Sequence, residues 1–145
     1  MKIRNGSKSL SFTIEEYQYP SEKSHGDDYN YDANWLNVVI EYSDETGIKH
    51  YRDACLLTYE LENCTEKIHK IISGEEMLYF SDFMEPYLKL AVSRAGDRIV
   101  FGFEFVYDTA DGIWKSHKVS EVVSQARAQE MLDEMKSLSS RFPER

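Results

Sequence analysis

The sequence lacks the features that usually stabilise small secreted proteins or anchor a chain in a membrane. Its two cysteines, Cys55 and Cys64, form no CxxC pair, so we expect buried thiols and not a disulfide or a zinc site. No window approaches the roughly 20 apolar residues of a membrane span. The first residues also lack the apolar run of a signal peptide. We therefore expect a cytoplasmic protein.

Proline and glycine are scarce as well, with three and seven residues in a chain of 145. Hydrophobic residues make up 41% and charged residues 30%, which is typical of a soluble globular protein. A chain of this length fits one domain, which buries roughly 68 to 70% of its unfolded surface. We predict a single domain over residues 1–145, whose core needs no metal or disulfide.

Sequence motifs of common enzymes are missing. The chain has no GxxxxGK(S/T) phosphate loop, no GxGxxG turn and no GxSxG elbow. Its histidines, at positions 25, 50, 69 and 117, are scattered over different predicted elements. The nearest approach to a metal cluster is His25 with Asp27, Asp28 and Asp32, but loop carboxylates at irregular spacing usually bind water. We expect no catalytic residue, metal or cofactor, although a triad assembled in space would not show in the sequence.

The net charge of −9 is unevenly distributed. Residues 1–14 carry three bases and no acid, residues 15–62 carry twelve acids and three bases, and residues 63–145 carry fourteen acids and eleven bases. An acidic sector of this kind repels nucleic acid and anionic membranes, and it attracts a basic partner over long range. The alternative is that these acids only keep the protein soluble.

Alternating apolar residues predict most of the strands. In the stretch Tyr29–Tyr42, residues from Trp35 onward alternate, with Leu36, Val38, Ile40 and Tyr42 on one face and Trp35 as a large buried anchor. The strongest pattern places four aromatic residues on one face between residues 99 and 107. RNA-binding sheets carry such ladders too, but the interleaved residues here are Val, Gly and Glu, so we assign the ladder to the core. The predicted strands cover residues 9–17, 35–42, 48–57, 77–80, 87–93, 99–107 and 113–123.

Two helices complete the predicted fold. Thr58 is a candidate N-cap and Gly74 a candidate C-terminal cap for a helix over about residues 58–73. Ser124 begins a second helix, over about residues 124–142. Strands joined by short turns favour an antiparallel sheet. We predict an α+β fold with a sheet of about six to seven strands and both helices packed on one face.

Three motifs occur in an order that resembles a known family. They are Asp32-Ala33-Asn34-Trp35-Leu36, the segment CLLTYEL over residues 55–61, and EPYL over residues 85–88. Over roughly residues 10–105 the chain resembles the WapI-type immunity proteins of bacterial polymorphic toxin systems. The resemblance implies a cytosolic protein without catalytic activity, which binds and neutralises the tRNA-cleaving C-terminal domain of a contact-dependent toxin. We expect the matched motif residues to be structural: Trp35, Leu36, Glu60, Leu61, Glu85 and Pro86.

Tyrosines supply a candidate binding surface. Seven of the ten fall between residues 17 and 59, and tyrosine is favoured at protein interfaces because it offers a rigid ring with a polar tip. Combined with acids, they suit a basic surface such as that of a nuclease. The predicted toxin-binding residues are Glu15, Glu16, Tyr17, Asp27, Asp28, Tyr29, Tyr31 and Asp32. Two alternatives remain: a non-catalytic cytosolic adaptor module that shares only the fold, and an enzyme.

Overall fold

The computed structural model describes residues 1–23, 29–109 and 111–145. In this part of the chain, eight strands form two four-stranded antiparallel sheets, each with its strands in chain order. The first sheet, sheet A, contains β1 Lys2–Asn5, β2 Lys8–Tyr17, β3 Trp35–Asp44 and β4 Gly47–Leu57. The second, sheet B, contains β5 Leu78–Phe80, β6 Leu88–Ala95, β7 Arg98–Asp108 and β8 Trp114–Val123. The helices are α1 Tyr31–Asn34, α2 Thr58–Ser73 and α3 Gln125–Arg141.

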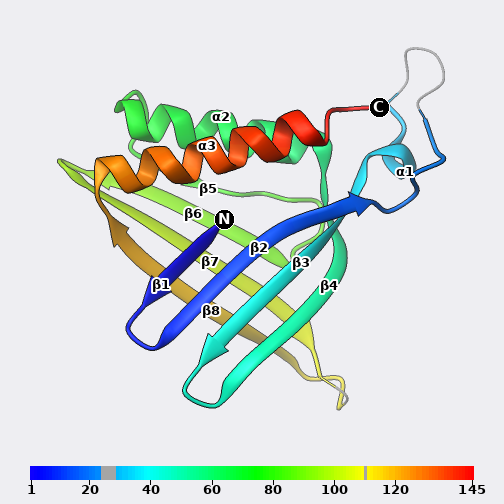
Figure 1. Cartoon of the computed structure of the whole chain (residues 1–145), viewed down its shortest axis with the longest axis horizontal. Helices are drawn as coiled ribbons and strands as arrows, with labels where there is room; N and C mark the ends of the chain where they lie inside the picture. Colours follow the sequence, from blue (N-terminus) through cyan, green and yellow to red (C-terminus); the bar gives the residue numbers. More distant parts are fainter. Residues whose placement is uncertain (24–28, 110) are drawn as a thin grey trace.

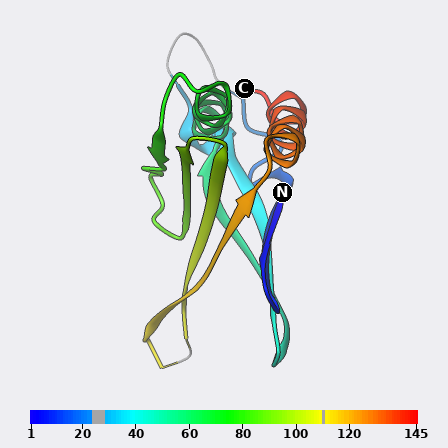
Figure 2. The same ribbon diagram turned by 90° about the vertical axis from the view of Figure 1, so that its left-hand side faces the viewer.

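The two sheets face each other, and the two long helices lie across one end of both (Figures 1 and 2). Helices α2 and α3 run side by side and contact the strands of both sheets. Phe12 of β2 meets Phe103 of β7 edge to face, with ring centroids 5.5 Å apart. The buried side of each sheet therefore faces the other sheet and the helices. None of the described helices is long and apolar enough to cross a membrane.

The aromatic ladder of β7 forms the floor of this core, as its alternation predicts. Ile99, Phe101, Phe103 and Phe105 are all at most 2% exposed. The opposing strand β3 contributes the predicted set Leu36, Val38, Ile40 and Tyr42, which is also buried. Each aromatic side chain buries roughly 150 to 250 Å². The period-two pattern thus identified both inner faces correctly.

The α+β class and both long helices are confirmed, while the strands divide differently from the prediction. The last strand of sheet A ends at Leu57, and α2 connects it to β5, the first strand of sheet B. The single sheet that the sequence predicts is therefore two sheets in the structure. The prediction missed β1, in which Ile3 is the one buried residue, and the single turn of α1. Trp35 is only partly buried, which corrects its expected role as a buried anchor; Ala33, Asn34 and Leu36 are the buried residues around it.

The start of α2 also differs from the prediction in one respect. Leu57 is the N-cap, and Thr58 is the first helical residue. The buried carboxylate of Glu60 accepts a hydrogen bond from the Leu57 N–H at 2.9 Å and another from the Met84 N–H. Glu60 therefore ties the helix start to the segment that leads through Glu85 into β6. The predicted caps Gly74, with φ of +85°, and Ser124 are both observed.

Candidate partner-binding surface

Three tyrosines from different elements meet at one end of the molecule. Tyr29 precedes α1, Tyr31 begins it, and Tyr59 lies in the first turn of α2. The Tyr29 ring lies 5.0 Å from that of Tyr31 and 5.5 Å from that of Tyr59, both edge to face. Tyr31 is 48% exposed and Tyr59 38% exposed. The cluster thus presents two rings to solvent around a third that is partly buried.

A buried asparagine fixes the backbone beneath these rings. Asn34, 0% exposed, accepts hydrogen bonds at its Oδ1 from the Thr58 hydroxyl and from the Arg145 N–H, each at 2.9 Å. Its Nδ2 donates to the carbonyls of Asn30 at 2.9 Å and Arg145 at 3.2 Å. Both donors and both acceptor positions of the amide are satisfied. One side chain therefore joins the α1 turn, the α2 N-terminus and the C-terminal segment.

A second asparagine caps α1. Asn30 is the N-cap of α1, and its Oδ1 accepts from the N–H groups of Asp32 at 3.1 Å and Ala33 at 3.4 Å. The Tyr29 hydroxyl lies 3.4 Å from the Thr58 hydroxyl. The conformation that displays Tyr29 and Tyr31 is thus set by side-chain hydrogen bonds to the backbone.

Three carboxylates lie on the segments that carry or adjoin these rings. Asp32 is exposed in the α1 turn. Glu62, three residues after Tyr59 and hence on the same side of α2, lines a hollow of about 420 Å³ together with Thr58 and Glu144. Desolvation raises the pKa of the Tyr29 phenol, and the negative charge of Glu144 acts in the same direction. Tyr29 is therefore a neutral hydrogen-bonding group at neutral pH. We call this region the tyrosine–acid surface: Tyr29, Tyr31, Asp32, Tyr59, Glu62 and Glu144.

Glu15 and Glu16 bind an arginine of their own sheet. Their carboxylates contact Arg52 of β4, Glu15 to Nε at 2.8 Å and Glu16 to Nη2 at 3.0 Å. Alternation places adjacent strand residues on opposite faces, so the sequence predicts that these two side chains point apart. That prediction is wrong, because the register with β3 shifts between Ile14 and Glu16, and a bulge turns both carboxylates toward Arg52.

Tyr17 is occupied by the C-terminal segment. Its hydroxyl donates to the Pro143 carbonyl at 2.6 Å, and the Arg145 guanidinium carbon lies 4.3 Å from its ring centroid. Phe142 packs edge to face at 5.5 Å. These contacts leave little of the ring for a partner. The remaining predicted contact residues, Asp27 and Asp28, lie outside the described residues.

Sequence reasoning overlooked three residues of the surface. Tyr59 and Glu62 could have been found, since their spacing on a predicted helix puts them on one side. Glu144 carries no such signal, because only the folded C-terminal segment brings it near Tyr29. Asn34 belongs to the motif over residues 32–36, but of that motif we assigned a structural role only to Trp35 and Leu36.

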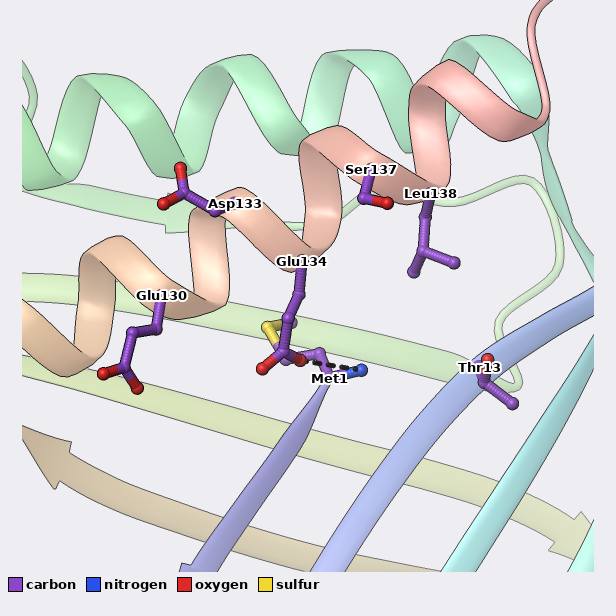
Figure 3. A pocket seen from close by; sticks show the side chains of 7 residues that line it. All are labelled: Met1, Thr13, Glu130, Asp133, Glu134, Ser137 and Leu138. Atoms are coloured by element: carbon purple, nitrogen blue, oxygen red, sulfur yellow. Dashed lines mark ion pairs between the residues drawn. The ribbon is translucent and has the colours of Figure 1, made fainter.

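A second acidic hollow, of about 690 Å³, lies between α3 and the first strands (Figure 3). Glu130, Asp133 and Glu134 line it. Glu134 contacts the Met1 ammonium at 3.4 Å and Arg127 at 3.6 Å, while Glu130 contacts Arg127 at 3.0 Å. Two of its three carboxylates are therefore paired within the chain. This hollow is less suited to a basic partner than the tyrosine–acid surface.

Groups suited to catalysis or metal binding are few in the described part of the chain. Within it, no three His, Cys, Asp or Glu side chains lie close enough to hold a metal ion. Desolvation raises the pKa of both buried thiols, Cys55 and Cys64, to about 12, so both are protonated at neutral pH. His117 is buried against tyrosines in the core, and its Nε2 lies 2.7 Å from the Tyr51 hydroxyl.

Comparison with known proteins gives one match. The profile of the WapI-like immunity protein family matches residues 2–143, nearly the whole chain. Neither the curated proteins nor the solved structures contain a match. The family match covers both sheets, α1, α2 and α3, and so includes every residue of the tyrosine–acid surface but Glu144.

Proposed function

Since the chain belongs to the WapI-like immunity protein family, we propose that it binds and neutralises the C-terminal nuclease domain of a contact-dependent toxin through the tyrosine–acid surface. The proposed target is a tRNA-cleaving domain, and the proposed site of action is the cytoplasm. The protein acts by binding alone, without a catalytic step, metal or cofactor.

Charge supports a nuclease as the partner. A domain that holds tRNA needs cationic side chains along the phosphate backbone. The tyrosine–acid surface offers the carboxylates of Asp32, Glu62 and Glu144 together with the exposed side chains of Tyr31 and Tyr59. Charges at the rim of an interface mainly accelerate association, whereas buried aromatic anchors slow dissociation. The surface supplies both kinds of group.

The packing of the tyrosine cluster is the observation that carries the proposal. Binding that must immobilise a mobile side chain costs about 0.5 to 1.5 kcal/mol for each one. Here the Tyr29 ring already contacts the rings of Tyr31 and Tyr59, and Asn34 fixes the segments that bear them. Much of the ordering cost is therefore met during folding.

The direct test is co-expression with the toxin domain encoded beside this chain, with bacterial growth as the readout. The wild-type protein should restore growth. In binding measurements on purified proteins, Tyr31→Ala and Tyr59→Ala should each weaken the toxin complex by about 30-fold, the effect of losing a hot spot worth about 2 kcal/mol. Trp114→Ala is the matched control, because this ring is 57% exposed and lies on β8 outside the surface. It should leave affinity unchanged.

Two outcomes would contradict the proposal. Full affinity in a folded Tyr31→Ala/Tyr59→Ala double variant would remove the tyrosine–acid surface from the interface. Failure of the wild-type protein to bind or neutralise the neighbouring toxin domain would instead favour the adaptor function. The toxin fragment should be added at low and at high salt, since loss of rim charges changes the salt dependence of association.

A further inference from the structure

The outward face of sheet B carries several exposed apolar side chains in a strongly acidic protein. Leu78 and Phe80 of β5 and Val122 of β8 are 53%, 66% and 64% exposed. Their neighbours in sequence, Tyr79 and Val123, point into the core, so these three side chains point outward. The long helices lie across the end of the sheets and not over this face (Figure 2).

A hollow of about 270 Å³ lies on this face, over Gly102 and Ala91. A Cβ atom added at Gly102 would meet the Ala91 Cβ and carbonyl at 3.8 Å, an ordinary contact. The fold therefore has room for a side chain there, and glycine in a strand interior weakens the strand. Internal packing does not explain this glycine. Close approach of another molecule would.

Strand register arranges the outward residues in three rows across the sheet. From β5 to β8 the first row reads Leu78, Ser93, Val100 and Val122. The second reads Phe80, Ala91, Gly102 and Ser120. The third, from β6 to β8, reads Lys89, Glu104 and Lys118.

The rows on one copy of the chain are complementary to the same rows on a second copy. A two-fold axis that runs along the strands between β6 and β7 places β6 over the β7 of a second copy, and β5 over its β8. Lys89 then faces the other copy's Glu104, Leu78 faces Val122, and the large Phe80 faces the small Ser120. Ala91 meets Gly102 at the centre, where sheets that cross at about 30° approach most closely. Charge, size and apolar character all match.

We propose that this face binds a second copy of the chain, forming a symmetric homodimer. Two molecules that each carry a charge of −9 repel one another except where the local charge is balanced. The outward face of sheet B meets that condition, since Lys89 and Lys118 offset Glu104 and Asp108. The tyrosine–acid surface lies on other elements and stays available to the toxin.

Charge exchange at Lys89 and Glu104 provides the test, with dimerisation measured by sedimentation velocity from about 1 μM to 1 mM. Lys89→Glu and Glu104→Lys each place like charges opposite one another, and each should weaken the dimer by about 10-fold or more. The double variant restores opposite charges and should return within about 3-fold of wild type. Lys8→Glu on β2 changes the net charge by the same amount as Lys89→Glu but lies outside this face, so it should leave dimerisation unchanged.

Gly102→Val provides a second, independent readout. It fills the hollow and removes a glycine from a strand, so it should raise the unfolding temperature of the monomer while weakening the dimer. A wild-type protein that stays monomeric to 1 mM would overturn the proposal, as would a double exchange variant no better than the singles. Loss of toxin affinity in Lys89→Glu, with a monomeric wild type, would assign this face to the toxin.

Discussion

Replacing Asn34 with alanine would remove four hydrogen bonds that join three segments of the chain. A hydrogen bond contributes about 1 kcal/mol net, and a buried group left without a partner costs about 1 to 3 kcal/mol. The Thr58 hydroxyl retains Tyr29 as a neighbour, and the Arg145 backbone lies in the exposed C-terminal segment, so water compensates part of the loss. We expect a loss of about 2 to 3 kcal/mol in the free energy of unfolding.

Urea denaturation followed by circular dichroism measures this change. For a domain near 150 residues, about 2 to 3 kcal/mol corresponds to a decrease of roughly 6 to 12 °C in melting temperature. Asn30→Ala is the matched control, since it removes the cap of the one-turn α1 but leaves the Asn34 side chain in place. That variant should lose only about 1 kcal/mol.

The affinity for the toxin should also depend on the hydrogen bonds of Asn34. Asn34 contacts none of the three tyrosine rings, yet it holds the segments that carry them, so Asn34→Ala should also weaken toxin binding. The reasoning would be refuted if Asn34→Ala lost less than about 0.5 kcal/mol of stability. A stable variant with full toxin affinity would show that neither the four hydrogen bonds of Asn34 nor the geometry they set is needed.

Further predictions concern groups in the core and on sheet A. Burial, with help from Lys49, lowers the pKa of His117, so the unfolded chain binds the proton more readily; the stability that His117 contributes is complete above about pH 6.5 and declines as the pH falls below it. His117→Gln should reduce that acid-side decline in urea midpoints measured between pH 7.5 and 5.5. Glu60→Ala should cost about 2 to 3 kcal/mol by chemical denaturation, because it removes the acceptor for two backbone N–H groups, whereas Glu60→Gln should cost less. Arg52→Ala should leave the unfolding free energy nearly unchanged, because solvent screens this exposed ion pair, and 0.5 M salt should abolish any remaining difference.

Alternation and capping signals were sufficient for most of the fold. The aromatic face of β7 and the apolar face of β3 follow from residue spacing alone, and Gly74 and Ser124 mark helix boundaries through their backbone chemistry. The division into two sheets was not predictable, because spacing says which face of a strand is buried but not which strand lies opposite. The four-residue β1 is too short for an alternating pattern to show.

The candidate surface was only partly predictable, for similar reasons. Tyr29, Tyr31 and Asp32 come from one continuous stretch, and the structure keeps them together. The sequence predicts that Glu15 and Glu16 point to opposite faces of the sheet, and this is wrong because one extra residue in a strand changes the face to which the following side chains point. No residue type marks the position of such a bulge. Glu144 reaches Tyr29 only through tertiary contacts more than a hundred residues apart.

The arrangement of the strands has a consequence for how the chain folds. Each sheet is a meander whose neighbouring strands are consecutive in sequence, so every pairing joins strands that follow one another along the chain, and the longest connection, residues 18–34, lies between β2 and β3. Contacts between the sheets, such as Phe12 with Phe103 and Tyr51 with His117, join residues far apart in sequence. Local pairings form faster than distant ones. We expect each meander to gain structure early and the docking of one on the other to limit the rate, so that the hydrogen bond between Tyr51 and His117 is among the last contacts to form.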